Sequence, residues 1–132
     1  MQARDVMTAK PMTGKVSETV AAVMQTMFTQ DIRHLPIVSG KELVGMISDR
    51  DLRQFSQALL DDAGKGRAQL SAPVGKMMTA DVLTADPESD VDDLIDIMIE
   101  NKVGAVPIVD VDGALVGIVS YIDILRAAAG KL

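Results

Sequence analysis

The chain has 132 residues, a length typical of a compact protein with a substantial core. Its formal charge of −6 disfavours a nucleic-acid surface, which needs basic residues to neutralise phosphates. The lack of cysteine excludes disulfides, thiolate metal sites and cysteine nucleophiles. No apolar run approaches the roughly 20 residues of a membrane span, and the N-terminus has no signal-peptide pattern. We therefore expect a cytoplasmic protein that binds neither nucleic acid nor membrane.

The same series of motifs occurs twice, about 71 residues apart. The repeated motifs are Met-Thr-Ala at 7–9 and 78–80, Pro-Ile-Val at 36–38 and 107–109, and Leu-Val-Gly at 43–45 and 115–117. A duplicated unit usually packs on itself about a pseudo-two-fold axis, so equivalent positions form paired sites. We divide the chain into repeat 1 at 1–60, a polar linker at 61–71 and repeat 2 at 72–132.

Repeat 1 opens with a short extended stretch from Met7 to Lys15 that leads into a helix. The apolar positions of this helix have the i, i+3, i+4, i+7, i+8 spacing of one buried face, and they are Val20, Val23, Met24, Met27 and Phe28. Two short apolar strands at 34–38 and 43–47 follow, separated by a turn. A closing helix is expected from about Asp49 to Leu60.

Repeat 2 has the same order of elements. The apolar face of its first helix is Val91, Leu94, Ile95, Met98 and Ile99. Ser89 and Asp92 resemble a capping box, which predicts that this helix begins at Ser89. A hairpin turn at 110–113 and a closing helix at 121–129 complete a β-α-β-β-α unit. Because neither copy would bury enough apolar surface alone, we expect both to share one core in an α/β fold.

These motifs resemble the CBS domain, which is named after cystathionine β-synthase. The matching signals are the opening Met-Thr, the His-Leu-Pro-Ile-Val strand, the Leu-Val-Gly strand and a Ser-x-x-Asp entry to the last helix. The resemblance covers nearly the whole chain and implies two CBS repeats packed as a stand-alone Bateman module. In that family the pair binds AMP, ADP, ATP or S-adenosylmethionine in clefts between the repeats. It then regulates a partner protein by conformational change, commonly as a homodimer joined through its helices.

The Ser-x-x-Asp motifs place a hydroxyl and a carboxylate at the start of each closing helix. A helix N-terminus attracts anions, and a carboxylate can accept two hydrogen bonds from ribose hydroxyls. The resemblance implies that Asp51 and Asp123 bind ribose, and that Ser48 and Ser120 bind phosphate. The alternative is an ordinary N-cap followed by an acid that the helix dipole favours.

Cations distinguish the two repeats. Repeat 1 has Arg33, His34, Arg50 and Arg53 at positions where repeat 2 has Gly104, Ala105, Ile122 and Leu125. Because arginine binds phosphate bidentately, we expect two unequal sites, with phosphate-bearing ligands favouring Arg33, His34 and Arg50. The alternative is that Arg50 and Arg53 are exposed helix residues that pair with Asp49 or other acids.

The adenine base is expected against the opening stretch of each repeat. The candidates are Met12 and Thr13 in repeat 1, and Leu83 and Thr84 in repeat 2. With so few aromatic residues in the chain, the base would lie between aliphatic side chains and backbone. Thr13 and Thr84 are equally well explained as ordinary strand residues.

Other functions have weaker support. The acids at 90–96 lie at a helix start and indicate a solvated face rather than a metal site. No nucleophile, general base or metal cluster can be assembled, so we expect neither an enzyme nor a catalytic cofactor. The competing interpretation is a protein–protein interaction module with degenerate, non-binding pockets.

Overall fold

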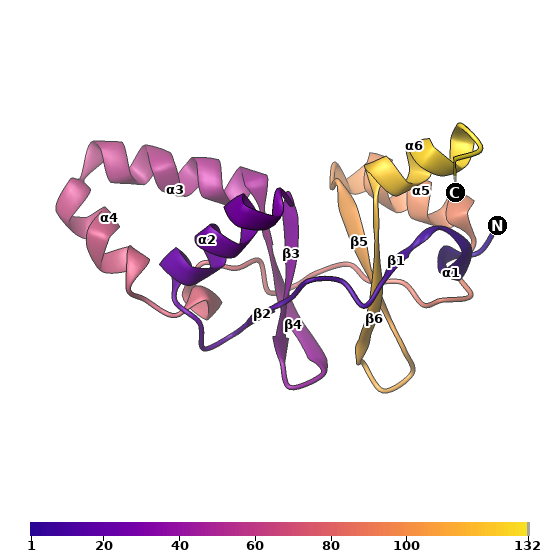
Figure 1. Cartoon of the computed structure of the whole chain (residues 1–132), viewed down its shortest axis with the longest axis horizontal. Helices are drawn as coiled ribbons and strands as arrows, with labels where there is room; N and C mark the ends of the chain where they lie inside the picture. Colours follow the sequence, from indigo (N-terminus) through magenta and orange to yellow (C-terminus); the bar gives the residue numbers. More distant parts are fainter. Residues whose placement is uncertain (132) are drawn as a thin grey trace. The chain divides into compact units, whose positions relative to one another are not determined.

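The computed structural model describes residues 1–131. They form two compact units, and each unit is a small sheet covered by helices (Figure 1). Unit 1 comprises Met1–Pro11, Lys41–Leu43 and Val82–Leu132, and unit 2 comprises Met12–Gly40 and Val44–Asp81. The α/β fold with two sheet-and-helix repeats is therefore confirmed. In the described residues, no helix combines the length and apolar character needed to cross a bilayer.

Unit 1 contains the hairpin and helices of repeat 2 together with the opening segment of repeat 1. Its elements are α1 (Ala3–Val6), β1 (Thr8–Ala9), α5 (Val91–Asn101), β5 (Ala105–Val109), β6 (Leu115–Ser120) and α6 (Tyr121–Ala128). The sheet order is β1-β6-β5, and both pairings are antiparallel. In Figure 1 the indigo N-terminal segment runs beside orange β6, so the first strand of the chain lies next to one of its last.

Unit 2 contains the strands and helices of repeat 1 together with the opening segment of repeat 2. Its elements are β2 (Gly14–Lys15), α2 (Val20–Gln30), β3 (His34–Ser39), β4 (Glu42–Ser48), α3 (Asp49–Asp61), α4 (Ala63–Leu70) and a 3-10 helix at Val74–Lys76. The sheet order is β2-β3-β4, and β2 runs parallel to β3. Thr79, from the opening of repeat 2, forms an antiparallel bridge to Met46 of β4. The opening Met-Thr segments are therefore exchanged between the two repeats.

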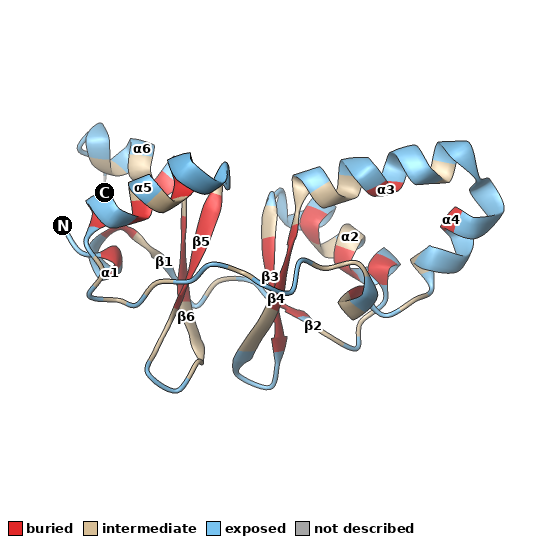
Figure 2. Cartoon of the chain, turned by 180° about the vertical axis from the view of Figure 1, so that it is seen from behind, coloured by how far each residue is buried: buried red, intermediate tan, exposed pale blue. Residues whose placement is uncertain are grey.

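The exchanged segments contribute buried side chains to the two hydrophobic cores. In unit 1, Ala3 and Val6 of repeat 1 are buried among Val91, Leu94 and Val119 of repeat 2. In unit 2, Val74 of repeat 2 packs in the cluster that contains Val23, Met27, Leu35, Ile37 and Ile47. The expectation of one shared core is therefore wrong. Each unit has its own core, and each core contains apolar side chains from both repeats. Figure 2 shows buried positions in the strands and in parts of helices α1, α2 and α5.

Two glycines allow the exchanged segments to lie close to the sheets. A Cβ on Gly117 of β6 would collide with the Sδ atom of Met7, and a Cβ on Gly45 of β4 would collide with the Sδ atom of Met78. These two glycines come from the repeated Leu-Val-Gly motif, and the two methionines come from the repeated Met-Thr motif. The methionine of each repeat thus packs against the glycine of the other repeat.

Two local predictions need correction. The stripes of α2 and α5 are narrower than expected, because Phe28 is 86% exposed and Ile99 is 69% exposed. The N-cap of α5 is Asp90, whose side chain accepts the Asp92 N–H at 3.0 Å, so the helix begins at Val91. The interval 61–71 contains helix α4, and the N-cap of this helix is Asp62.

Candidate functional site

The two Ser-x-x-Asp motifs form the same structure at the N-termini of α3 and α6. In repeat 1 the Ser48 backbone N–H donates to Asp51 Oδ2 at 2.8 Å, and the Ser48 hydroxyl donates to the same oxygen at 3.1 Å. The Asp51 N–H donates back to Ser48 Oγ at 3.3 Å. The corresponding distances for Ser120 and Asp123 are 2.8, 3.1 and 3.4 Å. Each motif is therefore a complete capping box, the alternative that the sequence left open.

A capping box leaves part of the carboxylate for another donor. Oδ2 of each aspartate is held by its serine, whereas Oδ1 of Asp51 has no hydrogen-bond partner within residues 1–131. An ionised carboxylate accepts up to about four hydrogen bonds. Asp51 thus keeps a fixed orientation and a free acceptor beside the first turn of α3, where unpaired N–H groups also favour an anion.

Asp123 is more enclosed than Asp51. Its exposed fraction is 6%, and Asp51 is only half-buried. Its Oδ1 accepts a hydrogen bond from the Thr8 hydroxyl at 3.4 Å and lies 4.0 Å from Nη1 of Arg126. A ligand hydroxyl at Asp123 would have to share Oδ1 with these two groups, so the two carboxylates are not equivalent acceptors.

The structure brings the predicted cations of repeat 1 close to Asp51. The Arg33 carbonyl accepts the N–H of Asp49, the first residue of α3, at 2.8 Å, which places the start of β3 beside the start of α3. His34 is half-buried at the same place. Burial lowers the pKa of His34 below 6.5, and the neighbouring Asp49 carboxylate only partly offsets this effect. His34 is therefore a neutral hydrogen-bonding group near pH 7, not the cation that the sequence suggested.

Arg50 projects from the first turn of α3 and is exposed. Within residues 1–131, neither Arg50 nor Arg53 forms an ion pair, in contrast to Arg4, which pairs with Glu88, and Arg126, which pairs with Asp123. The alternative in which Arg50 is paired with an acid is therefore not what the structure shows. Arg50 remains available to an anion at the α3 N-terminus.

The four candidates for contact with a base lie beside the expected strands. Met12 and Thr13 are exposed and precede Gly14, which pairs with Ile37 of β3. Leu83 and Thr84 are exposed and precede Ala85, which forms a parallel bridge to Ile108 of β5. Each pair thus belongs to the unit that holds the Ser-x-x-Asp motif of its own repeat.

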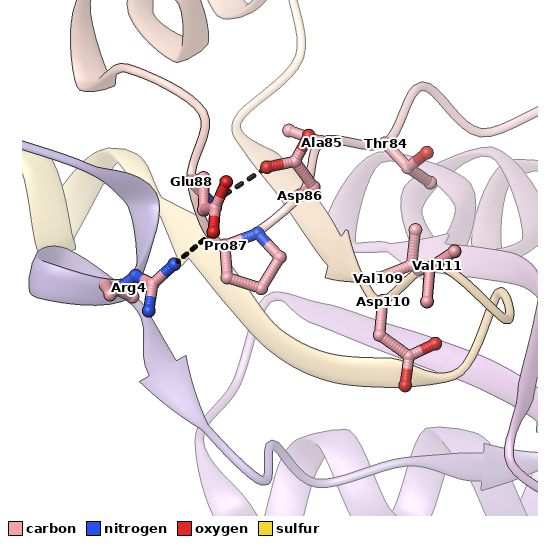
Figure 3. Close-up of a pocket in the computed structure, with 9 residues that line it drawn as sticks. All are labelled: Arg4, Thr84, Ala85, Asp86, Pro87, Glu88, Val109, Asp110 and Val111. Carbon is pink, nitrogen blue, oxygen red and sulfur yellow. Dashed lines mark hydrogen bonds and ion pairs between the residues drawn. The ribbon is translucent and has the colours of Figure 1, made fainter.

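A hollow of about 570 Å³ in unit 1 contains only one predicted site residue, Thr84 (Figure 3). Its lining residues are Arg4, Thr84, Ala85, Asp86, Pro87, Glu88, Val109, Asp110 and Val111. Arg4 and Glu88 form an ion pair of 3.2 Å at its edge. The hollow adjoins the Val109 end of β5, whereas Asp123 follows Ser120, which pairs with Ala105 at the opposite end. The Ser120–Asp123 motif is therefore remote from this hollow.

Two site residues in unit 1 were missed by the sequence analysis. Arg126 supplies a cation beside Asp123, in the repeat that was thought to lack one, and Thr8 reaches Asp123 from the other repeat. The i, i+3 spacing of Asp123 and Arg126 on one helix is a signal that could have identified Arg126. Among residues 1–131 no group of three or more histidines or carboxylates is placed to hold a metal ion.

The family model of the CBS domain matches residues 3–58 and 74–130. The chain therefore belongs to the CBS domain family and contains two tandem CBS repeats, as its motifs suggested. It is 35% identical to inosine-5′-monophosphate dehydrogenase of Thermoplasma acidophilum over 92% of this chain and 21% of that enzyme. The chain thus spans about a fifth of the length of this relative.

Two solved structures resemble the whole chain. The crystal structure of CBSX2 in complex with AMP has a TM-score of 0.85 and 26% identity, covering 98% of this chain and 96% of that one. The CBS domain pair of protein MJ0100, in complex with 5′-methylthioadenosine and S-adenosyl-L-methionine, has a TM-score of 0.79 and 28% identity, covering 97% and 99%. Both similar proteins are CBS proteins that bind adenosine-containing ligands.

Proposed function

We propose that this chain is a regulatory module that binds an adenosine-containing ligand and signals its presence to a partner protein. The observation that carries this proposal is the duplicated capping box, in which the serine binds Oδ2 of the aspartate at each helix N-terminus and makes no hydrogen bond to Oδ1. AMP in CBSX2 and S-adenosylmethionine in MJ0100 support the same class of ligand. AMP, ADP, ATP and S-adenosylmethionine all share the adenosine group.

In the proposed site of repeat 1, ribose hydroxyls donate to Asp51, and phosphate approaches the N-terminus of α3. Ser48 contributes to phosphate binding if its hydroxyl proton turns from Asp51 Oδ2 toward the ligand. Arg33 and Arg50 supply positive charge, and neutral His34 donates a hydrogen bond. The base lies against Met12 and Thr13.

The proposed site of repeat 2 uses Asp123 for ribose, Ser120 for phosphate, and Leu83 with Thr84 for the base. Its cation is Arg126, which already lies 4.0 Å from Asp123. Because this site has one nearby arginine and an enclosed carboxylate, we expect it to prefer ligands with less negative charge. A di- or triphosphate should favour the site of repeat 1.

Regulation requires that the ligand bind two conformations unequally. Residues 1–11 of repeat 1 belong to unit 1, and residues 72–81 of repeat 2 belong to unit 2, so a ligand that moves either of these segments acts on both repeats. We further propose that the module is a homodimer joined through its helices. Phe28 and Ile99, which are exposed on α2 and α5, are the apolar side chains that a second copy would cover.

A thermal-shift panel with AMP, ADP, ATP and S-adenosylmethionine tests the binding proposal. A ligand at 100 times its Kd adds about 2.7 kcal/mol to the free energy of unfolding, which raises Tm by several degrees. Asp51→Asn and Asp123→Asn keep an oxygen for the serine cap but remove negative charge, so each should reduce the shift from its own site. No shift with any of the four ligands would instead favour an interaction module with non-binding pockets.

A further inference from the structure

One hydrogen bond in unit 1 connects the opening segment of repeat 1 to the proposed ribose-binding carboxylate of repeat 2. The Thr8 hydroxyl donates to Asp123 Oδ1 at 3.4 Å. The other oxygen, Oδ2, accepts the Ser120 N–H at 2.8 Å and the Ser120 hydroxyl at 3.1 Å. A carboxylate oxygen can accept two hydrogen bonds, but Asp123 is only 6% exposed, which leaves little room for a second donor beside Thr8.

The segment that carries Thr8 is attached to β6 by a very short strand. β1 has two residues, and Thr8 pairs with Ile118. Beyond β1, the Lys10 N–H donates to the Val116 carbonyl at 3.3 Å. Lys10 has a φ of 49°, in the left-handed region that residues other than glycine rarely adopt. A short strand next to a strained residue opens at low free energy, so loss of the bond to Asp123 should loosen this segment.

The equivalent position in unit 2 lacks this hydrogen bond. Thr79 bridges Met46 of β4, as Thr8 pairs with Ile118 of β6. Among residues 1–131, however, the Thr79 hydroxyl forms no hydrogen bond with Asp51, whose Oδ1 has no partner in this part of the chain. The two aspartates therefore differ by one donor, and this donor comes from an exchanged opening segment.

A ribose hydroxyl that donates to Asp123 Oδ1 competes with the Thr8 hydroxyl for the same oxygen. Arg126 Nη1 also lies 4.0 Å from Oδ1, but the Arg126 side chain is 61% exposed and can turn into solvent. The threonine side chain is short, and its β-branching restricts χ1. The Thr8 hydroxyl can therefore leave Oδ1 only by a change of χ1 or by a shift of β1.

We propose that Thr8 competes with the ligand for Asp123, and that its displacement transmits occupancy of the repeat 2 site to the opening segment of repeat 1. The inference rests on the proposed function and names the site that signals. The repeat 1 site binds ligand without a comparable change, because no donor has to leave Asp51 Oδ1. The same competition weakens ligand binding at Asp123.

Thr8→Val tests the competition, because valine keeps the shape of threonine and has no hydroxyl. The Asp51→Asn chain is the background, so that the repeat 2 site dominates, and AMP is the probe. By titration calorimetry, Thr8→Val should make AMP binding roughly two- to ten-fold tighter, the range for removal of one competing hydrogen bond. Thr79→Val, the matched control, should leave Kd unchanged. Thr8→Ser, which keeps a hydroxyl, should also leave Kd unchanged.

Hydrogen exchange at the Lys10 amide tests the transmission in the wild-type chain. AMP should make this exchange faster, because the displaced Thr8 no longer holds β1 to Asp123. In Thr8→Val the exchange should be faster without ligand, and AMP should cause no further change. The 2′,3′-dideoxy analogue of AMP, which has no ribose hydroxyl, should leave the Lys10 exchange rate of the wild-type chain unchanged.

The remaining outcomes separate the inference from the proposed function. AMP binding that is unchanged or weaker in Thr8→Val overturns the competition, and an unchanged Lys10 exchange rate in the wild type overturns the transmission. AMP binding that Asp51→Asn abolishes means that only the repeat 1 site is used, which overturns the inference and leaves the proposed function standing. No AMP binding by the wild-type chain, together with no shift in the ligand panel, removes the proposed function itself.

Discussion

The hydroxyl of Thr8 donates a hydrogen bond to Asp123 Oδ1 at 3.4 Å, although 115 residues separate them in the sequence. Thr8 belongs to the opening motif of repeat 1 and Asp123 to the closing helix of repeat 2. The bond lies in unit 1, where β1 pairs with β6. A carboxylate proposed to bind ligand is thus in contact with the segment of repeat 1 that belongs to unit 1. A regulatory signal would begin at this contact.

Alanine at Gly117 or Gly45 should destabilise the fold. The added Cβ would overlap Met7 or Met78 respectively, and overpacking of this kind costs about 1–3 kcal/mol. Gly64→Ala is the matched control, because this exposed glycine in α4 has only Asp62 Oδ1 nearby, at 3.7 Å. The control should stabilise the protein by up to about 1 kcal/mol. Urea denaturation of the three variants checks this, and equal effects would argue against the close methionine contacts.

Val74→Ala should loosen unit 2, although Val74 lies in repeat 2. Its side chain is fully buried beside Val23 and Leu35, and its truncation should cost about 2 kcal/mol. Hydrogen exchange should become faster at the amides of β3 and remain unchanged in β5. Val111→Ala, at a position 98% exposed, is the control. Faster exchange in β5 alone would contradict the exchanged arrangement.

The sequence predicted the elements well because hydrophobic periodicity and the duplication are local signals. It did not predict the exchange of opening segments, since Met7 to Pro11 has the same sequence pattern whichever sheet it joins. The predicted buried face of α2 is too wide because Phe28 is apolar and has the i+4 and i+8 spacing from Met24 and Val20 that the pattern requires. Its exposure follows from its position about 100° around the helix from buried Met27.

Arg50→Ala should weaken ATP binding more than AMP binding. Arg50 lies in the first turn of α3 without an ion pair among residues 1–131, so its charge is available to a phosphate chain. A hydrogen bond to a charged group contributes about 1.5–3 kcal/mol, so a loss of roughly ten-fold or more is expected. Arg53→Ala, one turn further along the exposed surface of α3, is the control. Equal ATP affinity in both variants would exclude Arg50 from the site.

His34 should make the protein less stable in mildly acidic solution. Its folded-state pKa lies below 6.5, so the unfolded chain takes up a proton that the folded chain resists. The corresponding stability is present above pH 6.5 and is lost as the pH falls toward the folded pKa. Carboxylates titrate mostly below about pH 5, which leaves a window for the single histidine. Urea denaturation across this window should show a smaller pH dependence for His34→Gln, and identical slopes would refute the assignment.

The candidate site was only partly readable from the sequence. The Ser48–Asp51 and Ser120–Asp123 pairs are found by their spacing, because i and i+3 at a helix start determine a capping box. The neutral state of His34 depends on burial, and the position of Thr8 depends on tertiary structure. Neither property is encoded in local spacing.

The central claim is that the two Ser-x-x-Asp motifs form unequal adenosyl sites, and titration calorimetry with ATP tests it most directly. The account predicts that wild-type protein binds ATP, that Asp51→Asn weakens the tighter site about ten-fold or more, and that Asp123→Asn leaves that site intact. Binding that neither substitution alters, or no heat with ATP, AMP or S-adenosylmethionine, would contradict it.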